Sequence, residues 1–313
     1  MDSRNIEELK EKFRNEIRLS NDSLLGKFPI EKYLELLEKY PRISGYHYVS
    51  PEVNEYTENI VQDSSKDVLE IYHQLLLVEL ISRNKDKLAN QELPDAIKQL
   101  YVRNFSRILG NITSRSQTRG FYLYPNDKFF KDMGVCTQRL IPVGSHKIHL
   151  SCISQRLVLR KGIRQFVSGL SFIAFELGGI KPIYEAHIDS HDPDSMKELN
   201  PDGYVRTLIN IANLLKLRKE VKGVGGNSSW FFDPRLEEIS PRLSYMRKVF
   251  TDNGGKLFYV KVSKDNSLEN ALAKSPTRKR LYREGKYVPT DYTVVWARKS
   301  LIAWANRVSG VSA

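Results

Sequence analysis

The sequence predicts an α/β protein in which a helical N-terminal segment precedes a mixed sheet flanked by helices. Up to about residue 112, apolar side chains recur every three or four positions, the period of one helix face. From residue 121 onward, short runs rich in β-branched and aromatic residues alternate with longer helical patterns. We therefore expect a helical subdomain over residues 1–112 and an α/β domain over residues 113–313. A doubly wound parallel sheet is the alternative for the second domain.

Four helices with one apolar face are predicted in the first domain, and residues 41–58 between them are expected to be rich in turns. These helices cover residues 6–17, 30–37, 65–83 and 97–109. Six strands are predicted in the second domain, at residues 138–143, 147–153, 182–188, 221–232, 257–262 and 292–296. Helices are expected between the strands, at residues 163–177, 204–218, 241–252 and 268–283. Glycines follow three of them, as is typical of helix C-termini.

The charge of the chain is unevenly distributed. The formal net charge is +12, yet residues 1–100 carry 14 basic and 19 acidic side chains, which leaves 35 basic and 18 acidic ones for the rest. This excess predicts a basic surface on the second domain that attracts phosphate-bearing or acidic partners. No helix-turn-helix, zinc-finger or RNP-like motif accompanies it, so specific nucleic-acid binding is not expected.

Cysteine usage and hydropathy indicate a cytoplasmic protein. Cys136 and Cys152 are the only cysteines and have no metal-ligand spacing, so neither a disulfide framework nor a structural zinc site is expected. The first 20 residues lack the apolar core of a signal peptide. No apolar run approaches the roughly 20 residues that span a bilayer, so no transmembrane segment is predicted.

A cluster of histidines and carboxylates ends the strand predicted at residues 182–188. Alternate side chains of a strand share a face, so Glu185, His187 and Asp189 are expected to point the same way, with His191 and Asp192 following. One of the first three could serve as a general base. A metal-dependent hydrolase centred on His187, Asp189 and His191 is an alternative, and an ordinary solvated turn is another.

Two further segments offer binding chemistry. Ser240 is a plausible N-cap with Pro241 at the first helical position, and the N–H groups of a helix start attract anions within reach of Arg242. The carboxylates of Glu237 and Glu238, just before Ser240, would repel a phosphate. Upstream, residues 223–226 are rich in glycine, but they lack the third spaced glycine and the following helix of a dinucleotide-binding loop.

Residues 228–296 contain a distinctive order of motifs. The order is a strand at residues 228–232, Asp233-Pro234-Arg235, a helix from Ser240, Gly254-Gly255, a strand, Asp265-Asn266, a helix with Leu281-Tyr282, then Gly285 and Tyr287. This order resembles the C-terminal half of the GNAT acyltransferase superfamily. The resemblance implies a GNAT-like fold and transfer of an acyl group from a thioester, carried by coenzyme A or an acyl-carrier protein, to an amine or other small nucleophile. A non-catalytic GNAT-like binding protein is the alternative.

The resemblance also implies roles for individual residues. Ser240 and Arg242 would hold the cofactor phosphates, Asn266 would contact the cofactor arm, and Tyr282 would protonate the leaving thiolate. Asn227 and Ser228 would face the thioester carbonyl. A tyrosine suits the acid role because it stays protonated at pH 7. The acidic acyl-carrier protein fits the basic second domain by complementary charge, and no metal is expected.

Overall fold

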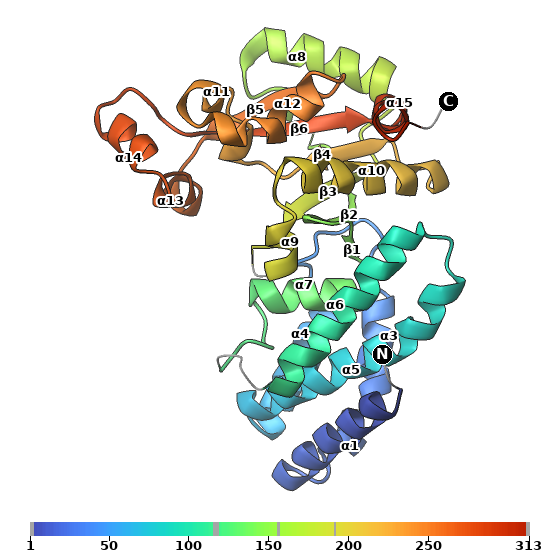
Figure 1. Ribbon diagram of the computed structural model, residues 1–313. Coiled ribbons are helices and arrows are strands. Elements are labelled where there is room, and N and C mark those ends of the chain that lie inside the picture. Colours follow the sequence, from blue (N-terminus) through green and yellow to red (C-terminus); the bar gives the residue numbers. More distant parts are fainter. Residues whose placement is uncertain (1–2, 115–118, 155–156, 191, 311–313) are drawn as a thin grey trace. The chain divides into compact units, whose positions relative to one another are not determined.

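The computed structural model describes residues 3–114, 119–154, 157–190 and 192–310. The chain divides into two compact units, Met1–Pro142 and Val143–Ala313 (Figure 1). The described part of the first unit is helical apart from its last two residues, which form a short strand. Its helices are α1 (Ser3–Ser20), α2 (Leu24–Lys27), α3 (Ile30–Glu38), α4 (Pro51–Asp63), α5 (Lys66–Asn90), α6 (Asp95–Ser114) and α7 (Asp127–Cys136).

Helix α5 forms the centre of the first unit and packs against α1, α3, α4, α6 and α7. It is buried around much of its circumference, so Leu75, Leu76 and Val78 are all inaccessible to solvent. Helix α4 corrects the prediction of a turn-rich stretch over residues 41–58. Ser50 accepts a hydrogen bond from the Val53 N–H at 3.2 Å and Pro51 occupies the first turn, so the segment begins a helix.

The sheet of the protein is mixed and has the strand order β1-β2-β3-β4-β6-β5. Strand β1 (Ile141–Pro142) is the last element of the first unit, and the second unit supplies β2 (His146–Ser151), β3 (Ile183–Ile188), β4 (Gly223–Gly226), β5 (Lys256–Val262) and β6 (Thr290–Ala297). Strands β3 and β4 run parallel, while the pairs β2–β3, β4–β6 and β5–β6 are antiparallel. The prediction of a mixed sheet flanked by helices is confirmed, and the doubly wound parallel alternative is wrong.

Helices cover both faces of this sheet. On one face, Val295 and Ile183 join a core cluster with α8 (Gly162–Ser171) and the π-helical segment η2 (Phe172–Leu177). On the other face, Trp296 packs against Phe250 of α12 (Tyr245–Thr251) and Trp304 of α15 (Arg298–Val308). Helix α10 (Pro201–Leu217) packs against both α12 and α15. A short helix, α9 (Pro193–Lys197), follows β3.

Three predicted elements of the second unit are interrupted. The helix expected at residues 268–283 is two helices, α13 (Asp265–Ala273) and α14 (Pro276–Arg283), because a proline inside a helix lacks the N–H that its hydrogen bonds need. The strand expected at residues 221–232, and with it the strand at residues 228–232 of the motif order, stops at Gly226. After it, Trp230–Phe232 form a 3-10 turn. The Phe232 ring packs against Gly226 so closely that a Cβ at Gly226 would lie 2.7 Å from the ring.

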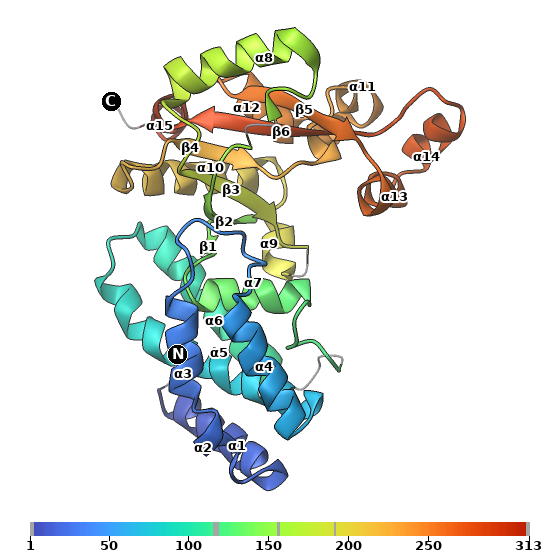
Figure 2. The same cartoon turned by 180° about the vertical axis from the view of Figure 1, so that it is seen from behind.

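The third interruption falls in the helix expected at residues 241–252. Pro241–Leu243 form a 3-10 turn, and α12 begins only at Tyr245. Figure 2 shows from behind that α13 and α14 project together from one end of the sheet. Among the described residues, none of the helices combines the length and apolar character needed to span a bilayer.

Candidate active site

The antiparallel pairing of β2 with β3 brings two histidines and a glutamate onto one face of the sheet. His149 lies opposite Glu185, and Lys147 lies opposite His187. Directly opposed residues share a face, as do alternate residues along a strand. His149, Glu185 and His187 therefore meet on the face that α8 covers farther along, where Ile183 of the same strand enters the core. We refer to these three residues as the His–Glu cluster.

The polar atoms of the His–Glu cluster are in close contact. His187 Nε2 and His149 Nδ1 lie 3.1 Å apart, and the two rings stack with their centroids 4.9 Å apart. Glu185 Oε1 lies 3.8 Å from His187 Nε2, while its other oxygen, Oε2, accepts a 2.8 Å hydrogen bond from Ser151 Oγ. Both histidines are buried, whereas the Glu185 side chain is 28% exposed. A small molecule can therefore reach Glu185 more readily than either ring.

Burial raises the pKa of Glu185 above its ordinary value, and the hydrogen bond from Ser151 partly opposes that shift. A carboxylate with a raised pKa is a stronger base than an exposed one, which suits it to accept a proton near neutral pH. Glu185 thus combines access from solvent with raised basicity.

Strands β3 and β4 part just beyond Glu185. They are paired over only three positions, from Tyr184 with Val224 to Ala186 with Gly226, and the Asn227 N–H donates to the Ala186 carbonyl at 3.1 Å. Beyond that bond, β3 continues along β2, whereas Ser229 exchanges hydrogen bonds of 2.8 and 3.1 Å with Tyr292 of β6. The two backbones therefore follow different neighbours from Asn227 onward.

The neighbour of Glu185 on β4 is a buried glycine, Gly225. A Cβ at Gly225 would lie 3.3 Å from the Val294 carbonyl oxygen, 3.6 Å from Ile183 Cδ1 and 3.7 Å from Val295 Cγ2. Asn227 and Ser228 follow and are both exposed. Glu185 thus has no side chain beside it on β4, and the two strands part just beyond it.

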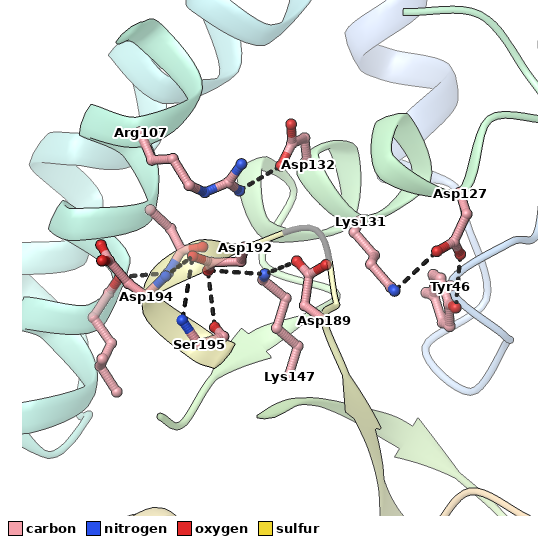
Figure 3. A network of polar contacts seen from close by, with 12 residues as sticks. Tyr46, Arg107, Asp127, Lys131, Asp132, Lys147, Asp189, Asp192, Asp194 and Ser195 are labelled. Atoms are coloured by element: carbon pink, nitrogen blue, oxygen red, sulfur yellow. Dashed lines mark hydrogen bonds and ion pairs between the residues drawn. The ribbon is translucent and has the colours of Figure 1, made fainter. Parts of the chain in front are cut away.

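Asp189 forms a buried ion pair with Lys147. Figure 3 shows Lys147 Nζ between the carboxylates of Asp189 and Asp192, and it lies 3.5 Å from Asp192 Oδ2. Asp192 in turn accepts hydrogen bonds from the N–H groups of Asp194 and Ser195 as the N-cap of α9, and from Ser195 Oγ at 2.9 Å. Asp189 is therefore less suited than Glu185 to act as a base. His191, the third member of the predicted metal centre, lies outside the described residues.

Ser240 does not cap a helix through its side chain. Its hydroxyl accepts a 2.9 Å hydrogen bond from Arg278 Nη1, whose guanidinium also lies over the Trp230 ring, 4.7 Å from the ring centroid. Arg242 is exposed and lines a groove of about 410 Å³ together with Pro201, Pro241, Ser244, Tyr245, Lys248, Val249, Asp252 and Asn253. The groove thus holds two cations and one carboxylate.

The charge of Glu237 is compensated locally. It forms ion pairs of 2.5 Å with Arg247 and 3.0 Å with Lys248, and the pairing with Lys248 contributes most to lowering its pKa. The repulsion of a phosphate that the sequence predicts from Glu237 is therefore weakened by its partners.

Asn266 and Tyr282 lie apart from the His–Glu cluster. Asn266 is exposed in the first turn of α13, and Tyr282 is an exposed residue of α14. Both helices project from the sheet in the two opposite views, away from β3 (Figures 1 and 2). The fold therefore brings Glu185 and His187 together but does not bring Tyr282 to them.

Similar solved structures are acyltransferases. One, an acyltransferase in complex with decanoyl-CoA, is 12% identical with a TM-score of 0.46, and the match covers 91% of this chain and 98% of that one. Another, an acyltransferase in complex with decanoyl-CoA and teicoplanin, is 11% identical with a TM-score of 0.44 and matches over 92% and 99% of the two chains. No protein-family model and no curated protein matches the chain.

Sequence reasoning missed two residues of this region, His149 and Lys147. Both lie in the short run His146–Ser151, whose alternation of polar and apolar side chains predicted a strand. The alternation indicated that His149 and Lys147 share a face, yet it carried no information on the strand that pairs with β2. A search for polar residues at alternate positions in every predicted strand would have marked them.

Proposed function

We propose that this chain is an acyltransferase that moves an acyl group from a coenzyme A or acyl-carrier-protein thioester to an amine or other small nucleophile, on a GNAT-like second domain. The observation that carries the proposal is Glu185. It is a partly exposed carboxylate with a raised pKa, it is paired with Gly225, and β3 and β4 part just beyond it. In this proposal the thioester binds where the two strands part, and Glu185 is the base that serves the incoming nucleophile.

The proposed reaction proceeds through a tetrahedral intermediate. The nitrogen lone pair of the amine attacks the thioester carbonyl, and the ammonium group that forms loses a proton to the Glu185 carboxylate. The carbon–sulfur bond then breaks, and Glu185 returns this proton to the departing thiolate. The products are an amide and a free thiol. Ser228 is proposed to face the carbonyl, since the Asn227 N–H is already bonded to Ala186.

The groove at Arg242 is proposed to hold the phosphates of a coenzyme A donor. Arg242 and Lys248 supply positive charge, and Tyr245 supplies an aromatic surface. Because a hydrogen bond to a charged group contributes about 1.5–3 kcal/mol, Arg242→Ala should raise KM for an acyl-CoA more than about tenfold. A carrier protein presents a different surface, so Arg242→Ala should leave KM for an acyl-carrier protein unchanged.

The proposal is tested by incubating the full chain with a panel of acyl-CoAs and acyl-carrier proteins plus primary amines, and following thiol release. Glu185→Gln should lower kcat/KM by about 10²–10⁴-fold, the usual contribution of a general base. Tyr282→Phe is the matched control and should leave the rate unchanged, because α14 projects away from β3. The proposal would be overturned if no thiol were released from either donor. Full activity of the Glu185→Gln variant would also overturn it.

A further inference from the structure

We propose that the His–Glu cluster is a binding site for one zinc ion, and that zinc bound there inhibits the acyl transfer. The binding part depends only on the arrangement of His149, Glu185 and His187. The inhibitory part rests on the proposed function, because it requires Glu185 to be the base.

The spacing of the ligand atoms suits a single ion. One ligand atom from each of the three residues can be chosen so that all lie within 4.8 Å of one another. Zinc binds histidine nitrogen at about 2.0–2.1 Å in a tetrahedral arrangement, which places two such nitrogens about 3.3–3.4 Å apart. The observed separation of His149 Nδ1 and His187 Nε2 is 3.1 Å, and that of His187 Nε2 and Glu185 Oε1 is 3.8 Å. The two separations bracket this spacing, and zinc would replace the hydrogen bond between the two histidine nitrogens.

The donor types favour zinc over calcium and magnesium. Two imidazoles and one carboxylate suit zinc, whereas calcium and magnesium prefer oxygen ligands alone. Three protein ligands leave the fourth tetrahedral position for water, and the partly exposed Glu185 side provides access for it. The donor set thus matches that of an open zinc site.

The residues around the cluster support this geometry. Ser151 Oγ holds Glu185 Oε2 at 2.8 Å, so Oε1 is the oxygen on the His187 side. This is the arrangement in which an outer hydrogen bond orients a ligating carboxylate. The nearest buried cation, Lys147, lies opposite His187 but is neutralised by Asp189 and Asp192, which reduces its repulsion of a metal ion.

Zinc binding and base catalysis compete for the same carboxylate. A Glu185 oxygen that donates its lone pair to zinc cannot accept a proton from the acceptor amine. Zinc should therefore slow thiol release, and a chelator should restore it.

The binding test uses the full chain, freed of metal with a chelator, and zinc chloride titrated by calorimetry. We expect one ion per chain. Loss of a residue that supports a ligand weakens metal binding by roughly 10–100-fold, and we expect Ser151→Ala to weaken zinc binding within that range. His149→Ala and His187→Ala each remove a ligand, so they should weaken zinc binding by more than that. His47→Ala is the matched control, because His47 is an exposed histidine that also contacts a carboxylate, Asp127, at 2.9 Å. This variant should bind zinc as the wild type does.

Cobalt(II) provides a second measurement, since a tetrahedral site with nitrogen ligands gives intense visible absorption that solvated cobalt lacks. If a histidine variant fails to fold, Glu185→Gln removes the third ligand with little change in shape and should also weaken binding. Equal zinc affinity in the wild type and in both histidine variants would overturn the proposal, as would an absence of stoichiometric binding. Zinc binding without any acyl transfer would refute the proposed function and leave the metal site standing.

Discussion

Replacing Lys147 by methionine should destabilise the second unit strongly. The ammonium group is 1% exposed, and its partners Asp189 and Asp192 are 4% and 2% exposed. Methionine fills a similar volume but removes the charge that compensates two buried carboxylates. Removing one partner of a buried ion pair costs about 3–5 kcal/mol, because the remaining charge stays buried without compensation.

The structure places the expected cost at the lower end of that range. Asp192 keeps its hydrogen bonds from the N–H groups of Asp194 and Ser195, at 3.1 and 3.3 Å, and from Ser195 Oγ at 2.9 Å. These bonds continue to compensate part of the buried charge, so we expect about 3 kcal/mol. For a unit of this size, 1 kcal/mol corresponds to about 2–4 °C, so the melting temperature should fall by about 6–12 °C.

Tryptophan fluorescence measures this change selectively. The three tryptophans of the chain, Trp230, Trp296 and Trp304, all lie in the second unit, so their emission during heating reports the unfolding of that unit. Lys197→Met is the matched control. Lys197 lies 3.5 Å from Asp194, the same separation as between Lys147 and Asp192, but the Lys197 pair is 79% and 43% exposed. Its loss should cost less than about 0.5 kcal/mol.

A double-mutant cycle decides whether charge is the cause. Asp189→Asn removes the carboxylate that Lys147→Met leaves uncompensated, so the double variant should be less destabilised than the sum of the two single variants. A coupling energy of about 1 kcal/mol or more is expected for groups in direct contact. The reasoning is refuted if the two effects add, or if Lys147→Met melts like Lys197→Met.

Three further outcomes follow from the structure. In the wild type, kcat/KM for acyl transfer should rise with pH along a limb centred above the ordinary pKa of glutamate, because burial raises the pKa of Glu185, and Glu185→Gln should abolish that limb. Burial lowers the pKa of His146 to about 4, so near pH 6.5 the unfolded chain binds a proton that the folded unit does not bind. The free energy of unfolding should therefore fall by about 2 kcal/mol between pH 7 and 5. His146→Gln should flatten this dependence, as measured by urea unfolding followed by fluorescence. Arg278→Met should lower the free energy of unfolding by about 1–3 kcal/mol in the same assay, because Arg278 donates hydrogen bonds to Ser240 Oγ and the Ala271 carbonyl. Arg280 is exposed, so Arg280→Met should leave this free energy nearly unchanged. Equal effects of the two variants would contradict a structural role for Arg278.

Local patterns in the sequence located most elements of the second unit. The strands predicted at residues 182–188 and 257–262 correspond to β3 (Ile183–Ile188) and β5 (Lys256–Val262), since β-branched and aromatic runs favour extended backbone. The helix predicted at residues 163–177 does end before Gly178, which has a φ of +72°. The break at Pro276 was visible in the sequence as well, and its cost should have outweighed the helical pattern around it.

The sequence by itself determined that Glu185 and His187 share one face of a strand, because the period of two is a property of any extended chain. Only the tertiary structure decided that His149 joins them and that Asp189 is paired with Lys147. Both results depend on the register between β2 and β3, which are distant along the chain. A register is decided by which side chains pack together across the sheet, so no local pattern in either strand specifies it. The parting of β3 from β4 is likewise a tertiary feature, because the chain after Asn227 pairs with β6, through Ser229 and Tyr292.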